Sequence, residues 1–210
     1  MSRWYEWLNM LVGLLVIVNP LLAVSAFSTL SGDDDPARRR NTGRHAAITV
    51  AVVLTVSALA GEAVLGFFGI RLPEFQVGGG ILILLMALSM LNARPGPARH
   101  TAEEADEAQE KAQIGVVPLG IPLLAGPGAI STAIIYAHQA RGWVDVAVLL
   151  IAVWLVAALV WLSMRLGDEL VRRMGVLGLN IATRIMGLLL AAIAVGFVTQ
   201  GLRTLLPGLA

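Results

Sequence analysis

The chain has 210 residues, of which 57% are hydrophobic and 14% are charged, and its mean hydropathy is +0.79. Soluble domains contain roughly 45–50% apolar and about 25% charged residues, so this composition indicates an integral membrane protein. The formal net charge is only +1, and we expect no nucleic-acid partner. The absence of cysteine excludes disulfides and thiol catalysis, and the three histidines lie too far apart to predict a metal site. We expect no cofactor.

Six segments are long and apolar enough to cross a bilayer, because a spanning helix needs about 20 predominantly apolar residues. They predict an all-α protein with spans near Trp7–Leu30, His45–Phe68, Phe75–Ala93, Ile114–Ala140, Trp143–Leu166 and Leu179–Leu206. The letters "AVSA" in the first span resemble a signal-peptide cleavage site. The apolar run before them exceeds the usual length of about 7–15 residues, so we expect a retained helix.

A polar linker, residues 94–113, divides the chain into two three-helix units, residues 1–93 and 114–210. The termini and the even-numbered loops carry four basic residues, whereas the odd-numbered loops, including this linker, carry ten. Basic loops stay in the cytoplasm. We therefore predict a multi-pass protein of the plasma (inner) membrane with a cytoplasmic linker and with both termini outside, in the periplasm.

The two units resemble each other at two places. Pro127 lies 107 positions after Pro20, and small and hydroxyl-bearing residues follow both prolines. The stretch "QVGGGILILLMA" (76–87) aligns with "RIMGLLLAAIAV" (184–195) at a shift of 108, which places Gly79 opposite Gly187. Because each unit has an odd number of helices, the second unit enters the membrane from the opposite side. The sequence thus predicts a 3+3 inverted-topology repeat of the kind found in transporters.

The first and fourth predicted helices are broken at matching places, Asn19-Pro20 and Gly126-Pro127-Gly128. Proline costs about 3 kcal/mol in a helix interior, and irregular backbone at membrane depth is tolerated only inside protein or beside a wet cavity. Since proline suits the first turn of a helix, we expect a half-helix to begin at each proline, the first capped by Asn19. A simple kink is the alternative, but the match between the units favours a site.

Two opposed half-helices bring their N-termini together near the bilayer midplane, where free N–H groups and a partial charge of about +0.5 attract a carboxylate. The following hydroxyls can add hydrogen bonds, or they can bond within their own helix or serve close packing. We predict a substrate site formed by Asn19, Pro20, Leu21, Ser25, Gly126, Pro127, Gly128, Ala129, Ser131 and Thr132.

Glu62 lies toward the outer end of the second predicted span. An ionisable residue within a span suggests function, and here the function would be to carry a coupling proton. The alternative is a carboxylate that reaches the outer membrane interface. Two other features are predicted to be structural: the cluster Gly78-Gly79-Gly80 favours close helix packing, and Asp145 at the start of the fifth span suits the helix dipole.

Three blocks resemble the MarC family, also described as neutral amino-acid transporters of the NAAT or SnatA type. They are "VNPLLAVSAFSTLS", "FFGIRLPEFQVGGGILILLMALSML" and "VVPLGIPLLAGPGAISTAI", and the resemblance extends over all six predicted helices. It implies a six-helix inner-membrane protein, with some members moving small neutral amino acids such as glycine and alanine. The family commonly has glycine after its Asn-Pro. Here Leu21 and Leu22 follow instead, and we expect these bulkier residues to narrow the cavity.

These observations favour a secondary carrier for small neutral amino acids, coupled to protons if Glu62 acts as predicted. A channel or facilitator for a small polar solute is the alternative, because facing half-helices can also line a pore. We expect no enzymatic activity, since no Ser–His, paired-Asp or metal-ligand arrangement is present. The expected partners are a small neutral amino acid and the lipid bilayer, and the oligomeric state is left open.

Overall fold

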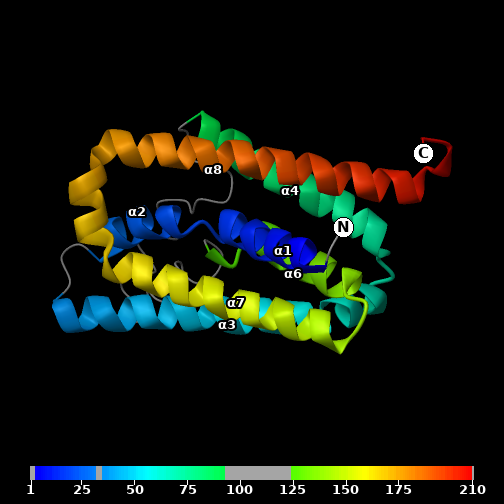
Figure 1. The fold of residues 1–210 in the computed structure, drawn as a ribbon, viewed down its shortest axis with the longest axis horizontal. Coiled ribbons are helices and arrows are strands. Elements are labelled where there is room, and N and C mark those ends of the chain that lie inside the picture. Colours follow the sequence, from blue (N-terminus) through cyan, green and yellow to red (C-terminus); the bar gives the residue numbers. More distant parts are fainter. Residues whose placement is uncertain (1–2, 32–34, 93–123, 210) are drawn as a thin grey trace.

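The structure is a computed structural model that describes residues 3–31, 35–92 and 124–209, and these ranges fold into helices (Figure 1). The predicted linker, residues 94–113, lies outside the described residues. In chain order the helices are α1 (Arg3–Val18), α2 (Pro20–Leu30), α3 (Pro36–Phe67), α4 (Leu72–Leu91), α6 (Pro127–Gln139), α7 (Trp143–Arg165), α8 (Gly167–Leu205) and the short 3-10 helix η2 (Pro207–Leu209).

Five helical segments in the described ranges are long and apolar enough to span a membrane. They are Arg3–Ser28, Pro36–Phe67, Leu72–Leu91, Trp143–Arg165 and Leu177–Leu205. The predicted all-α membrane protein is therefore confirmed. Of the fourth predicted span, Ile114–Ala140, the structure describes only the part that contains α6, so this fourth span stays a prediction.

The helix that contains the second span begins at Pro36, nine residues before the predicted start at His45. The Asp35 carboxylate caps it by accepting hydrogen bonds from the backbone N–H groups of Ala37 and Arg38, at 2.8 and 2.9 Å. Proline at the first helical position needs no donor there, so Asp35-Pro36 is a strong start signal. The three arginines at 38–40, which were predicted to lie in the first loop, are consequently part of the same helix as the second span.

The bundle consists of two helix pairs with the broken helices beside them. Helix α3 packs against α7, and α4 packs against α8. The first broken helix, α1–α2, also contacts α7, while α6 contacts α3 and α4. Helix α1 begins and α8 ends at the same end of the bundle, whereas α3 begins and α7 ends at the other (Figure 1).

Small residues let the backbones of α4 and α8 approach each other closely. Three glycines of this pair each face a carbonyl oxygen of the other helix: Gly80 faces Ala194, Gly187 faces Ala87, and Gly201 faces Pro73. A β-carbon added to these glycines would lie only 2.8–3.2 Å from that oxygen. The contacting residues are seven positions apart on each helix: Pro73, Gly80 and Ala87 on α4, and Gly187, Ala194 and Gly201 on α8. They therefore form one continuous antiparallel seam. The predicted packing role of the glycine cluster is confirmed for Gly80, while an added β-carbon on Gly78 would meet nothing within 4 Å.

Helix α8 turns a corner at Gly175 before it enters the bundle, as Figure 1 shows. The backbone there has φ 64° and ψ 175°, a region that only glycine occupies readily. The eight residues from Gly167 to Met174 therefore form a separate short helical stretch. The long stretch that follows contains the span at Leu177–Leu205, close to the predicted start at Leu179.

Candidate functional site

The first span is broken at Asn19, as predicted. Helix α1 ends at Val18 and α2 begins at Pro20, while Asn19 between them has the left-handed backbone angles φ 50° and ψ 80°. Its side-chain oxygen accepts a hydrogen bond from the Leu22 N–H at 3.2 Å, so Asn19 is the N-cap of α2. The Asn19 side chain is buried, with 2% of the residue exposed, which places this cap inside the protein.

The second half-helix, α6, begins at Pro127, where the sequence places it, while residues 93–123 before it lie outside the described residues. Gly126 is extended, with φ −71° and ψ 175°, and Pro127 is the first residue of α6. The first regular bond of this helix runs from the Ile130 N–H to the Gly126 carbonyl at 3.0 Å. The N–H groups of Gly128 and Ala129 precede that bond and have no partner within the helix. Both residues are buried, whereas Pro127 is exposed.

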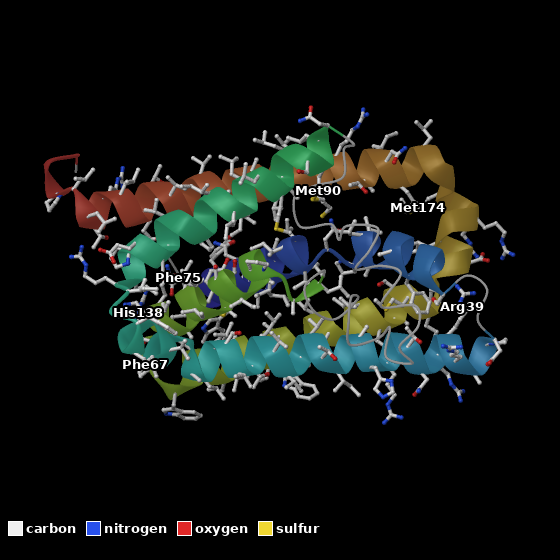
Figure 2. The ribbon with its side chains drawn as sticks, turned by 180° about the vertical axis from the view of Figure 1, so that it is seen from behind. Arg39, Phe67, Phe75, Met90, His138 and Met174 are labelled. Carbon is white, nitrogen blue, oxygen red and sulfur yellow. The ribbon has the colours of Figure 1, made fainter. Side chains whose placement is uncertain are left out.

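Both breaks lie against one face of α4. The Asn19 amide nitrogen is 3.8 Å from the sulfur of Met90, which Figure 2 labels. A β-carbon added to Gly128 would lie 3.4 Å from the sulfur of Met86 and 3.8 Å from the side chain of Ile17, in the last turn of α1. Because Met86 and Met90 are four residues apart, about 6 Å along a helix, the two half-helix starts are neighbours. The structure thus brings the two breaks together.

The hydroxyl groups beyond the breaks differ from one another. The Thr132 hydroxyl donates to the Gly128 carbonyl at 2.8 Å, which is the within-helix bond named as the alternative. Ser131 is buried against α4, where a β-carbon on Gly79 would lie 2.9 Å from its oxygen. Among the described residues the Ser131 hydroxyl forms no hydrogen bond, and it remains available to a ligand. The side chain of Ser25 lies outside the described set.

One partner of the first break was not predicted. The Ser163 hydroxyl of α7 shares its one proton between two carbonyl oxygens, that of Val160 at 2.8 Å and that of Pro20 at 3.2 Å. This contact gives the α2 start a fixed neighbour on α7. In the sequence, Ser163 stands out as a hydroxyl in an apolar helix, but this does not reveal that its partner lies 143 positions away. Leu21, the other predicted residue of this turn, is half-buried.

Glu62 lies at a different place from the breaks. Its carboxylate is 3.1 Å from the imidazole of His138, and 69% of its side chain is exposed. His138 is labelled in Figure 2 near the C-terminal end of α6, which is about 16 Å along the helix from Pro127. The pair borders a groove whose other wall carries Gln76 and Gln200, joined by a 3.0 Å hydrogen bond. Glu62 therefore faces a polar groove at the end of the bundle.

Asp145 has a larger structural role than the predicted dipole contact. Its carboxylate accepts hydrogen bonds from Arg3 at 3.0 Å, from the Trp7 indole at 2.9 Å and from the Arg141 backbone N–H at 3.0 Å. Arg141 in turn pairs with Glu6 at 2.9 Å. This network fastens the start of α1 to the start of α7. Within the described ranges, no three histidine, aspartate or glutamate side chains gather as a metal site would require.

Comparison with known proteins places the whole chain in one family. Residues 4–206 match the family described as "MarC family integral membrane protein". The chain is 35% identical over 198 residues to the UPF0056 membrane protein YhcE of Escherichia coli, covering 94% of this chain and 92% of that protein. It is also 36% identical over 187 residues to a UPF0056 membrane protein of Methanocaldococcus jannaschii, covering 89% and 91% of the two chains. No solved structure matches it. The chain therefore belongs to the MarC family of integral membrane proteins.

Proposed function

We propose that this protein is a plasma-membrane transporter of the NAAT or SnatA type, a secondary carrier that moves small neutral amino acids. In this proposal the chain crosses the membrane six times as a 3+3 inverted repeat, with both termini outside. The single observation that carries the proposal is the convergence of two half-helix starts, at Pro20 and Pro127, on Met86 and Met90 of α4. Broken helices that meet inside a bundle are how many transporters build a substrate site.

The α4–α8 seam supports the inverted repeat. Gly80 and Gly187 are 107 positions apart, as are Ala87 and Ala194, and the same interval separates the two prolines. The contact of Gly80 with Ala194 therefore has its symmetry mate in the contact of Gly187 with Ala87. A two-fold axis in the membrane plane produces such a reciprocal pair of contacts.

The chemistry of a zwitterion fits the two breaks. The N–H groups at the start of α6 that have no partner within the helix are donors for a carboxylate, which the helix dipole also stabilises. The side-chain oxygen of Asn19 and the hydroxyl of Ser131 are acceptors for an ammonium group. A β-carbon added to Gly128 would lie 3.0 Å from the side chain of Ile83, so little room remains beside this backbone and a substrate with a small side chain is favoured.

Burial of the site favours a carrier over a channel. No more than 3% of Asn19, Ala129, Ser131 or Thr132 is exposed, so these four residues of the site are closed to water in this structure. A channel needs an open path, whereas a carrier passes through a closed state.

The Glu62–His138 pair supports proton coupling, because a carboxylate and an imidazole in a polar groove can exchange a proton with water at the outer end.

Uptake into proteoliposomes tests the proposal. We expect saturable glycine and alanine uptake with counterflow, strongly reduced by Asn19→Ala and by Gly128→Leu. Gly196→Leu is the matched control, because Gly196 lies in α8 with nothing within 4 Å of an added β-carbon. Glu62→Gln should leave counterflow intact and abolish proton-driven accumulation. Normal transport by both site variants would contradict the site, and flux without counterflow would indicate a channel.

A further inference from the structure

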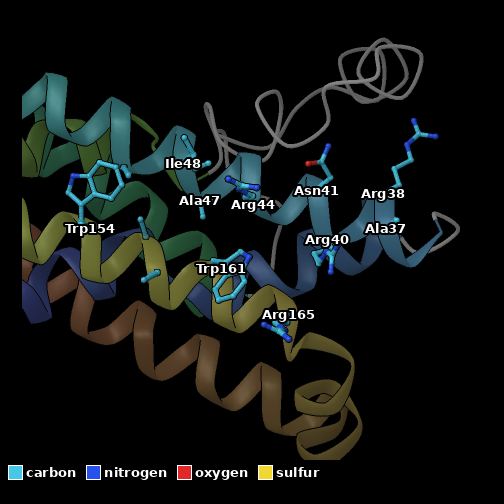
Figure 3. Close-up of a pocket in the computed structure, with 13 residues that line it drawn as sticks. Ala37, Arg38, Arg40, Asn41, Arg44, Ala47, Ile48, Trp154, Trp161 and Arg165 are labelled. Carbon is cyan, nitrogen blue, oxygen red and sulfur yellow. The ribbon is translucent and has the colours of Figure 1, made fainter.

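A large groove lies between α3 and α7, at the end of the bundle opposite the termini, and its volume is about 910 Å³ (Figure 3). Four arginines line it: Arg38, Arg40 and Arg44 from α3, and Arg165 from α7. Two tryptophans, Trp154 and Trp161 of α7, line it as well. None of its described lining residues is acidic, so the groove attracts anions.

Both walls of the groove change from basic to apolar in the same direction. On α3, Arg40 and Arg44 are followed on the same face by Ala47 and Ala51. On α7, Arg165 is followed toward the bundle centre by Trp161, then by Ala158 and Ala157, and finally by Trp154. From Arg40 to Ala51 the distance along the helix is about 16 Å. The groove thus has a charged mouth and an apolar stem, and a soluble anion would use only the mouth.

Three of the four arginines that line the groove, Arg40, Arg44 and Arg165, are available to a ligand. Within the described part of the chain, Arg40, Arg44 and Arg165 form no ion pair, whereas arginines elsewhere, such as Arg3 and Arg141, are paired with carboxylates at 2.9–3.0 Å. Arg165 stacks over Trp161, with its guanidinium carbon 5.4 Å from the ring centre. A stacked guanidinium keeps its N–H groups free to bind phosphate oxygens in the guanidinium plane.

The apolar stem has the shape that an acyl chain needs. Ala47, Ala51 and Ala157 are buried with 6%, 1% and 3% exposed, and they form a shallow floor of small side chains. Trp154 is 53% exposed and stands beside this floor as a wall. Helices α3 and α7 are both candidate spans, and the stem lies toward the middle of both helices, whereas the arginines lie near the start of α3 and at the end of α7.

We propose that this groove is a binding site for an anionic phospholipid. The phosphate lies among Arg40, Arg44 and Arg165, and one acyl chain follows the alanine floor between Trp161 and Trp154. A basic pocket between spanning helices on the side that faces anionic lipid is a general mode of lipid recognition. The proposal does not depend on the transported substrate, because none of the described residues that line the groove belongs to either break.

Native mass spectrometry of the full chain, released from detergent with defined lipids, tests this proposal. We expect phosphatidylglycerol to be retained and phosphatidylcholine to be lost. The triple variant Arg40→Gln, Arg44→Gln, Arg165→Gln should lose the preference, on the order of 100-fold, since each arginine near an anionic lipid contributes roughly 5-fold. The triple variant Arg172→Gln, Arg173→Gln, Arg184→Gln removes the same charge outside the groove and should retain it.

Further measurements distinguish the phospholipid from other occupants of the groove. Inorganic phosphate at millimolar concentration should not displace the lipid, because it cannot fill the apolar stem, and displacement would assign the site to a soluble anion. Ala51→Trp fills the stem without changing the charge and should release the lipid as well. Equal retention of phosphatidylglycerol by both triple variants would overturn the proposal. So would a lipid-free dimer that only the Arg40, Arg44 and Arg165 variant dissociates, because the groove would then be an interface between two copies of the chain.

Discussion

Replacing Gly80 with alanine tests whether backbone contact holds α4 to α8. The new β-carbon would lie 2.8 Å from a methyl group of Val198, 3.0 Å from the Ala194 carbonyl oxygen and 3.1 Å from the Val198 nitrogen. Two of these three atoms are backbone and cannot rotate away. Overpacking of this kind costs about 1–3 kcal/mol. Alanine also gains about 1 kcal/mol over glycine in a helix, so the net change for Gly80→Ala is about 0–2 kcal/mol of destabilisation.

The neighbouring Gly78→Ala is the matched control, because its added β-carbon meets nothing within 4 Å. It has the same gain in helix propensity, so the difference between the two variants isolates the close approach and should be about 1–3 kcal/mol. Unfolding in mixed micelles with increasing dodecyl sulfate, followed by tryptophan fluorescence, measures this difference. Equal stability of the two variants would refute the seam as the contact that joins these helices.

Two further substitutions test single features of the fold. Asp145→Asn removes the charge that three donors share, and it should lower the Tm more than Glu74→Gln, whose carboxylate pairs with Arg71 at the surface. Equal losses would show that the network at Asp145 does not fasten α1 to α7. Gly175→Ala should cost about 1–3 kcal/mol because of its φ of 64°. Gly196→Ala, in a regular helix with open space, should be neutral or stabilising in the same assay.

The breaks could be predicted because their causes are local. Asn19-Pro20 and Gly126-Pro127 each place a helix cap directly before a proline that starts a helix. The cap at Asn19 accepts its hydrogen bond from Leu22, only three residues away. The network around Asp145 could not be predicted in this way. Its partners Arg3 and Trp7 lie 142 and 138 positions away, and the sequence gives no sign of that pairing.

The start of α3 shows a different reason for error. The signal, Asp35 followed by Pro36, is local, but the spans were located by hydropathy, which finds the part of a helix in lipid and not the helix itself. The extra turns are functional in our proposal, because they carry Arg40 and Arg44 into the groove between α3 and α7. The cap signal together with the apolar run predicts one continuous helix that carries these arginines.

The alignment of the two units illustrates what only contacts can decide. A shift of 108 places Gly79 opposite Gly187, and a shift of 107 places Gly80 there, so three successive glycines cannot determine the register. In the structure Gly80 faces the partner helix α8, while Gly79 faces Ser131 of α6. The two glycines therefore serve different interfaces. Gly80 joins α4 to α8, and Gly79 lets the first turns of α6 approach α4, so a bulky residue at either position would separate α4 from a different helix.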